Sequence, residues 1–198
     1  MSKHISWRAQ SHLFIISVGF VSDMQIIQLS TALPRNGYTT EKLMEEFQCK
    51  LPERVVQNVL NLGVSKRYLV SQPASVKTET PMNENGLIEL CSEACRKAVE
   101  GANLHLRDID YLITAYDVNP FLSPGLSQLL VPQLGLDPFV RHVNVQGVAS
   151  TAFTKTLQLA EDYLAARPED NVLICISGVS SYWFQNQVRA RICLARPT

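Results

Sequence analysis

Residues 140–164 read VRHVNVQGVASTAFTKTLQLAEDYL, and this stretch decides the fold. Its first residues alternate in polarity, which places Val143 and Val145 on one face of a short strand. A turn at Gln146-Gly147 follows, and the chain then enters a helix. The apolar side of this helix recurs at helical spacing, at Ala149, Ala152, Phe153, Thr156, Leu157, Ala160 and Leu164. The stretch therefore predicts a strand that leads through a tight turn, an elbow, into a long helix.

The elbow is a position where chemistry is favoured. The first residues of a helix lie at the positive end of its dipole, where free backbone N–H groups can hold an anion. A nucleophile placed there would be activated. In this feature the chain resembles the thiolase superfamily, and within it the chalcone synthase or type III polyketide synthase family. The elbow of that family reads Gln-Gly-Cys before small residues and a long helix, whereas the third residue in this sequence is Val148.

A second motif extends the resemblance towards the start of the chain. Residues 63–67 read GVSKR, similar to a Gly-Val-x-x-Arg segment that the family carries at this distance from its start. The similarity begins at Met24, with MQIIQLSTALP, and continues to about Phe184. It implies an α/β fold: one αβα half of a thiolase-like enzyme, the amino-terminal half, with a mainly parallel sheet and a central helix after the Gln-Gly elbow.

Val148 is compatible with the expected fold but not with the chemistry of the family. The chemistry of the family requires a thiolate that accepts an acyl group from coenzyme A, and a helix N-terminus and a histidine lower the pKa of that cysteine. An isopropyl side chain cannot attack a thioester. We therefore expect no catalytic residue at the elbow itself. Ser150, two residues further along, is a weaker candidate nucleophile because no base is assigned to it.

Composition excludes several classes of function. The 198 residues are 46% hydrophobic with zero formal net charge, which permits a sizeable core and gives no electrostatic reason to expect nucleic acid or a membrane surface as partner. The five cysteines have no metal-type spacing, so neither a disulfide scaffold nor a metal site is expected. Cys91 and Cys95 could form a redox or metal pair, but both fall in an apolar helical stripe and we expect them to be buried. This apolar stripe consists of Leu87, Leu90, Cys91, Ala94, Cys95 and Ala98. Free thiols suit a reducing cytoplasm.

Residues 1–23 are expected to form an N-terminal extension outside the fold. Lys3 and Arg8 precede an apolar run at residues 13–21, as in a signal peptide, but the residues of a cleavage site are missing. The run is also too short to span a bilayer, which takes roughly 20 residues. An export signal remains the alternative. Residues 24–184 would then form the thiolase-like half, and residues 185–198 a divergent, truncated tail.

Between these limits, strand and helix patterns alternate. Strands are predicted at residues 24–31, 108–116 and 171–176, and helices from residue 39, from residue 52, at 85–100 and at 126–136. Val55, Val56, Val59 and Leu60 would form the inner face of the second helix, which Gly63 ends. Pro132 predicts that the helix at 126–136 is short or kinked. Such alternation implies parallel strands with right-handed crossovers.

The resemblance assigns substrate contacts to two further residues. Thr114 ends a strand and matches a position that borders the acyl and coumaroyl pocket in chalcone synthase relatives. Phe184 falls where these enzymes place an aromatic gate between the coenzyme A tunnel and the elongation cavity. For both residues a purely structural role, support of the strand end or core packing, stays open. No metal and no cofactor are expected beyond acyl-CoA and malonyl-CoA as substrates.

The remaining catalytic residues of the family, a histidine and an asparagine, belong to its second half and act as an oxyanion hole. None of the four histidines here lies in a matching motif, and His142 is interpreted as structural. The resemblance thus implies a type III polyketide synthase-like acyltransferase, a decarboxylative condensation of acyl-CoA with malonyl-CoA. We expect this chain to be inactive. The alternatives are a non-catalytic partner subunit, a pseudoenzyme fragment, or an acyl-CoA-binding module, and a homodimer or a second chain supplying the missing half is the expected partner.

Overall fold

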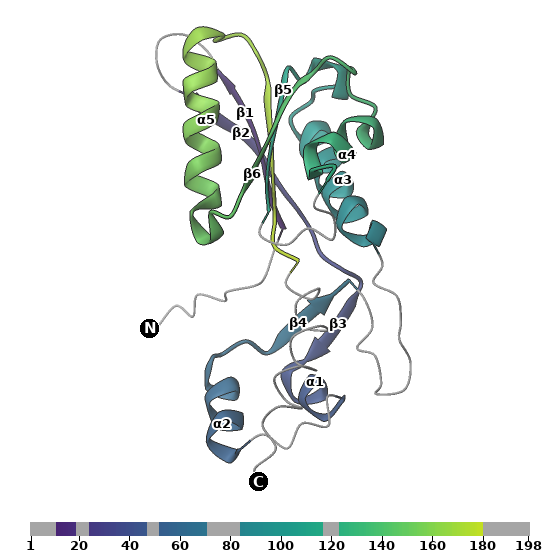
Figure 1. Ribbon diagram of the computed structural model, residues 1–198, viewed down its shortest axis with the longest axis vertical. Helices are drawn as coiled ribbons and strands as arrows, with labels where there is room; N and C mark the ends of the chain where they lie inside the picture. Colours follow the sequence, from purple (N-terminus) through teal and green to yellow (C-terminus); the bar gives the residue numbers. More distant parts are fainter. Residues whose placement is uncertain (1–10, 19–23, 47–51, 71–83, 117–122, 180–198) are drawn as a thin grey trace. The chain divides into compact units, whose positions relative to one another are not determined.

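The deciding stretch forms strand β6 (Arg141–Gln146) and helix α5 (Ala152–Ala166) in a computed structural model of the chain (Figure 1). The structure describes residues 11–18, 24–46, 52–70, 84–116 and 123–179. The chain divides into a larger unit, residues 10–33 and 84–178, and a smaller unit that includes residues 34–83. The elbow belongs to the larger unit.

A five-stranded sheet forms the centre of the larger unit, in the order β2-β1-β7-β5-β6. Strand β5 runs parallel to β6 and to β7, as the alternation of strands and helices predicts. Strand β1 runs antiparallel to both β7 and β2. Strands β2, β7, β5 and β6 therefore all run in the same direction and β1 alone is reversed within this sheet, which confirms the mainly parallel α/β sheet. Besides β6, its strands are β1 (Ser11–Val18), β2 (Met24–Ala32), β5 (Tyr111–Tyr116) and β7 (Val172–Ser177).

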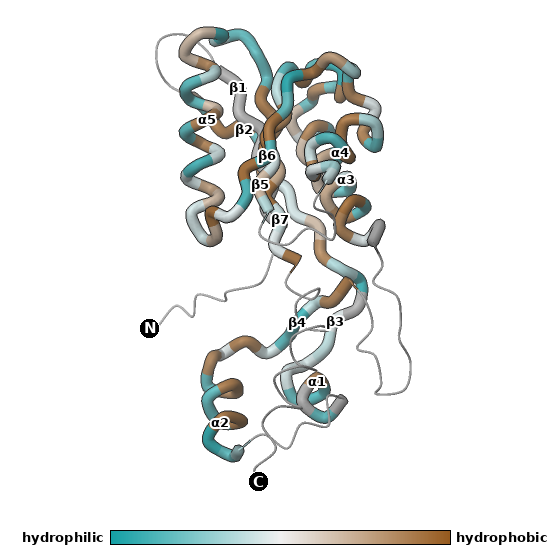
Figure 2. Tube along the Cα trace, in the orientation of Figure 1, coloured by the Kyte–Doolittle hydropathy of each residue, from teal (hydrophilic) through white to brown (hydrophobic). Residues whose placement is uncertain are grey.

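Helices cover both faces of this sheet. Figure 1 shows α5 on one face, and α3 (Glu84–Gly101) and α4 (Leu126–Leu134) on the other. Hydrophobic residues follow the central strands, while hydrophilic residues recur along α5 (Figure 2). On the α5 side the core consists of Ile113, Ala160, Leu164, Val172 and Ile174, with Val143 and Val145 packed against it. This confirms that both valines of β6 face the helix.

The helical periodicities also hold. The buried residues of α5 are Ala152, Thr156, Ala160 and Leu164, whereas Phe153 is 39% exposed. The predicted stripe of α3 is buried throughout, including Cys91 and Cys95. A hydrogen bond with the thiol of Cys175, together with burial, raises the pKa of Cys91 well above its usual value. The Cys91 thiol therefore stays protonated, and both buried cysteines pack as small apolar groups.

The prediction that residues 1–23 lie outside the fold is wrong for Ser11–Val18. These residues form β1, which pairs with β2 on one side and β7 on the other. Five of the six residues from Leu13 to Val18 are apolar, a composition that suits a strand in the interior of a sheet. The apolar run was expected to lie in an extension outside the fold, with an export signal as the alternative, and its strand-like length was overlooked.

The smaller unit contains short elements. Strands β3 (Asn36–Thr39) and β4 (Lys66–Leu69) form an antiparallel pair beside α1 (Thr40–Glu46). Helix α2 (Glu53–Asn61) begins after Pro52, and Gly63 follows its end with φ of 68°, as predicted. The predicted inner face of α2 is not buried: α2 has no buried residue, and Val55 and Leu60 are exposed.

Of two further predictions, one is confirmed and one is corrected. Helix α4 has nine residues, contains Pro132 and ends at Gly135 with φ of 73°, so it is short as predicted. The strand predicted at residues 108–116 begins only at Tyr111, because Leu106–Asp108 form a 3-10 turn.

Candidate active-site elbow

The backbone at the elbow adopts two left-handed conformations around residue 148. Gly147 has φ of 75°, which glycine accepts without cost, and Ala149 has φ of 45°, which is uncommon for a residue with a side chain. Such a conformation costs on the order of 1–3 kcal/mol and is kept only where the surrounding structure imposes it. Val148 lies between them with φ of −103° and ψ of −2°. The predicted sharp turn at Gln146-Gly147 is therefore present.

Val148 is the residue that immediately precedes the helical segment. A 3-10 turn, Ala149–Thr151, follows it and continues into α5. The backbone oxygen of Val148 accepts two hydrogen bonds from Thr151, one from the amide at 3.0 Å and one from the hydroxyl at 2.6 Å. The helix thus begins where the sequence predicted it, with one intervening turn of 3-10 geometry.

The side chain at position 148 is not an acid, a base or a nucleophile. Val148 is half-buried, and the exposed Ser150 lies beyond it in the 3-10 turn. The structure places no titratable partner against the Ser150 hydroxyl among the residues it describes. An aliphatic residue can fill space at a helix start but cannot form a covalent acyl intermediate.

Thr114, the predicted substrate contact, is fully buried. It is the register partner of Asn144 on the neighbouring strand, and its hydroxyl donates to Asn144 Oδ1 at 2.6 Å. The same oxygen accepts the backbone N–H of Ser127 at 2.7 Å. Because Ser127 is in the first turn of α4, Asn144 caps this helix from a distant strand.

Two further side chains complete this polar network. Asn144 Nδ2 donates to Gln128 Oε1 at 2.8 Å, and the hydroxyl of the buried Ser127 lies 2.9 Å from His142 Nδ1. His142 thus binds the start of α4, in agreement with its structural interpretation. Sequence reasoning missed Asn144, Ser127 and Gln128. The one available signal was the polar Asn144 between two apolar strand residues.

Three further points concern Phe184, a metal site and a membrane-spanning helix. Phe184 lies outside the described residues, so its role as a gate stays a prediction. Within the described parts of the chain, no group of three or more histidine, cysteine or acidic residues could hold a metal ion. No helix in those parts is long and apolar enough to cross a membrane.

No protein-family model matches the chain. Among curated proteins it is similar to the 3,5-dihydroxyphenylacetyl-CoA synthase of Streptomyces toyocaensis, with 24% identity over 85% of this chain and 45% of the relative. It is also similar to the 1,3,6,8-tetrahydroxynaphthalene synthase of Streptomyces coelicolor, with 26% identity over 79% of this chain and 44% of the relative. The chain therefore spans about half the length of these relatives.

Solved structures show the same fold relationship. A fungal type III polyketide synthase, ORAS, matches with a TM-score of 0.70 at 17% identity, over 92% of this chain and 51% of that protein. The 3-oxoacyl-[acyl-carrier-protein] synthase III of Aquifex aeolicus matches with a TM-score of 0.61 at 18% identity, over 79% of this chain and 45% of that protein. The larger unit thus has the fold of one thiolase-like half.

Proposed function

We propose that this chain, whose homologues are type III polyketide synthases, is a thiolase-like half of a condensing enzyme that performs no acyl transfer by itself. By family, the reaction is a decarboxylative condensation of acyl-CoA with malonyl-CoA. The observation that carries the proposal is the elbow, where left-handed Gly147 and Ala149 flank Val148, the residue that by resemblance occupies the nucleophile position of the family. Without a thiolate the acyl group has no covalent carrier.

The backbone of the elbow supports descent from a catalytic site. Left-handed conformations occur on both sides of Val148, at Gly147 and at Ala149. Such conformations cluster at active sites because they hold a reacting group in place. The packing of α5 against the sheet is retained around them. A non-catalytic partner subunit or pseudoenzyme would have this combination of an intact scaffold and an inert side chain.

A partner is part of the proposal, either a second copy of this chain or a second chain that supplies a histidine and an asparagine. Its support is apolar surface on the larger unit: Ile26, Ile27 and Leu29 of β2 are 43–55% exposed, and Phe153 of α5 is 39% exposed. Exposed apolar residues that gather on a few elements often mark an interaction surface. Three free, buried cysteines favour a reducing cytoplasm as the location.

Substrate contacts at Thr114 and Phe184 remain proposals by resemblance. The burial of Thr114 and its bond to Asn144 mean that contact with a thioester would require Asn144 to move. We therefore expect Thr114 to act on the acyl pocket through the position of the β5 end.

A turnover assay tests the proposed inactivity. The purified 198-residue chain is incubated with an acyl-CoA and radiolabelled malonyl-CoA, and extracts are examined for labelled polyketide. The chain should release none, and Val148→Cys should also release none because no oxyanion-hole histidine and asparagine accompany it. Labelled product from the wild-type chain would overturn the proposal.

A further inference from the structure

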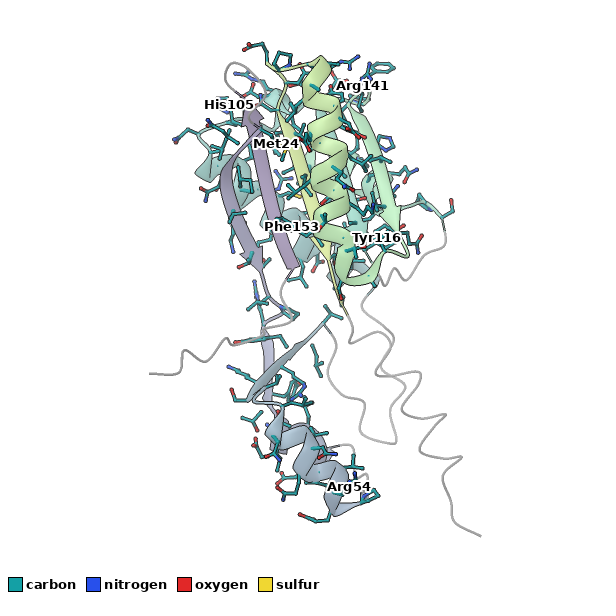
Figure 3. The ribbon with its side chains drawn as sticks, turned by 90° about the vertical axis from the view of Figure 1, so that its left-hand side faces the viewer. Met24, Arg54, His105, Tyr116, Arg141 and Phe153 are labelled. Atoms are coloured by element: carbon teal, nitrogen blue, oxygen red, sulfur yellow. The ribbon has the colours of Figure 1, made fainter. Side chains whose placement is uncertain are left out.

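A cluster of arginine and tyrosine residues lies at the end of the sheet opposite the elbow. Arg141 begins β6, Tyr163 belongs to the last turns of α5, and Arg167 follows the end of that helix. Figure 3 shows Arg141 at the far end of the sheet from Tyr116, where β5 ends. The guanidinium carbons of Arg141 and Arg167 lie 5.9 and 5.1 Å from the centre of the Tyr163 ring.

The tyrosine that holds both arginines is itself fixed. Its hydroxyl donates to Asp170 Oδ2 at 2.5 Å, and its ring lies 4.6 Å from that of Tyr111. Tyr111 is in turn the register partner of Arg141 on the adjacent strand. The ring platform is thus held by a strand, a helix and the turn before β7.

The two arginines lack acceptors. Among the described residues, no ion pair and no side-chain hydrogen bond uses either guanidinium group. The nearby carboxylates are already engaged: Asp170 accepts from Tyr163, and Asp110 accepts from the Asn171 amide at 2.8 Å. Asp108 accepts the His105 amide at 2.7 Å and lies 3.8 Å from Arg107. The two guanidinium groups carry ten N–H donors between them, and none of these has a protein acceptor among the described residues.

Two like charges on one ring repel each other. The two distances to the ring centre put the guanidinium carbons at most about 11 Å apart, close to the screening length of ~10 Å at 0.1 M salt, so part of the repulsion is felt. A ring contact with one cation contributes only about 0.5–1 kcal/mol at an exposed site, and packing alone gives no reason for a second. The carboxyl end of α5 carries about half a unit of negative charge near Arg167, and the Asp170 carboxylate adds one unit, so the two arginines together still leave a small positive excess.

We infer that Arg141, Arg167 and the Tyr163 ring form a binding site for a phosphate group, separate from the elbow. Each planar guanidinium group can present two parallel donors to a phosphate, a geometry that arginine supplies and lysine does not. The bound anion would bridge the two cations and remove their mutual repulsion. The site takes either inorganic phosphate or the terminal phosphate of an ester.

Calorimetric titration of the full chain with inorganic phosphate tests this inference, with sodium chloride at matched ionic strength as the blank. Phosphate should bind and raise Tm by about 2 °C or more at tenfold saturation, whereas chloride should not. Arg141→Gln and Arg167→Gln should each weaken binding at least about tenfold, since each removes a charge-assisted pair. Arg54→Gln, at an exposed arginine on α2, is the matched control and should bind as the wild type does.

Lysine variants guard against loss of folding. Arg141→Lys and Arg167→Lys keep the charge but lose the paired donors, so they should unfold at the wild-type Tm in chloride and still bind phosphate more weakly. Methyl phosphate in place of inorganic phosphate tells an ester site from a site for the free ion. The assignment is overturned if phosphate gives no more heat and no higher Tm than chloride, if acetate binds as tightly as phosphate, or if Arg54→Gln weakens binding equally.

Discussion

Asn144 connects three elements through one side-chain amide. Its oxygen accepts from Thr114 and from the Ser127 amide, and its nitrogen donates to Gln128. Gly125 makes this possible, because a Cβ built there would lie 2.5 Å from Asn144 Nδ2. The chain at Gly125 is extended, with φ of −74° and ψ of 169°, so close approach and not backbone strain explains the glycine.

Gly125→Ala should therefore lower the free energy of unfolding by about 1–3 kcal/mol, since the amide must shift and its hydrogen bonds weaken. Urea denaturation measures the change. Gly178→Ala is the matched control, because a Cβ there meets nothing within 4 Å. Equal stability of the two variants would show that Asn144 is not held as described.

At this scale the sequence could predict some residues and not others. Residues 140–164 predicted the elbow, because the strand period, the glycine and the helical period are all local. The partners of Asn144 could not be predicted, because they depend on the register between β5 and β6, whose residues are 30 positions apart. The left-handed conformation of Ala149 has no signal in its residue type.

Strand β1 occupies an interior position although it comes first in the chain. It separates β7 from β2 and supplies the ladder partners of both. Without it, two strand edges would present unpaired N–H and C=O groups. An apolar run of strand length cannot be assigned to a sheet from sequence alone, because its partner β7 lies some 160 positions later. The apolar spacing of α2 likewise predicted an inner face, but the burial of that face depends on neighbouring elements that the local sequence does not specify. The structure shows no buried residue in α2.

Removal of residues 1–23 should abolish cooperative unfolding of the larger unit, as measured by circular dichroism during thermal denaturation. The loss of β1 leaves β2 without a neighbour in the sheet. A chain that lacks only residues 1–10, which precede β1, is the control and should unfold cooperatively. If both shortened chains unfold as the full chain does, β1 is not required for the sheet, and residues 1–23 would be an extension outside the fold.

For the whole molecule, stability should depend on alkaline pH through Tyr163. Its partial burial, together with the hydrogen bond to Asp170, raises the pKa of Tyr163 to about 12. An unfolded tyrosine has a pKa of about 10. The unfolded state thus loses its proton first, so the stabilisation is complete below about pH 10 and is lost as pH rises towards 12.

Tyr163→Phe removes this titration and the bond to Asp170 together. The variant should lose less stability than the wild type between about pH 10 and pH 12, as measured by urea denaturation at each pH. Other titrating groups, including the buried thiols, contribute to both proteins alike. Parallel losses in the two proteins would contradict the assignment of the shift to Tyr163.

The exposed apolar residues of the larger unit predict association at the scale of the molecule. Sedimentation velocity should show a species larger than the monomer as the concentration of the chain rises. If the partner is a second chain, the larger species should form when that chain is added. Leu29→Lys, at a residue 55% exposed on β2, should weaken self-association, because a charge would be buried in the contact. Leu62→Lys, at a residue 68% exposed in the smaller unit, is the control. A wild-type chain that stays monomeric at high concentration would contradict a homodimer.

Intact-mass spectrometry with peptide mapping measures whether residue 148 can carry an acyl group. Wild type, Val148→Cys and Ser150→Cys are each incubated with an acyl-CoA, and the acylated peptide is located. We expect no acyl group within residues 140–164 of the wild type. Val148→Cys should be acylated faster than Ser150→Cys, because the elbow directs position 148 at the helix start. An acyl group on the wild-type elbow, or equal labelling of the two cysteine variants, would contradict this expectation.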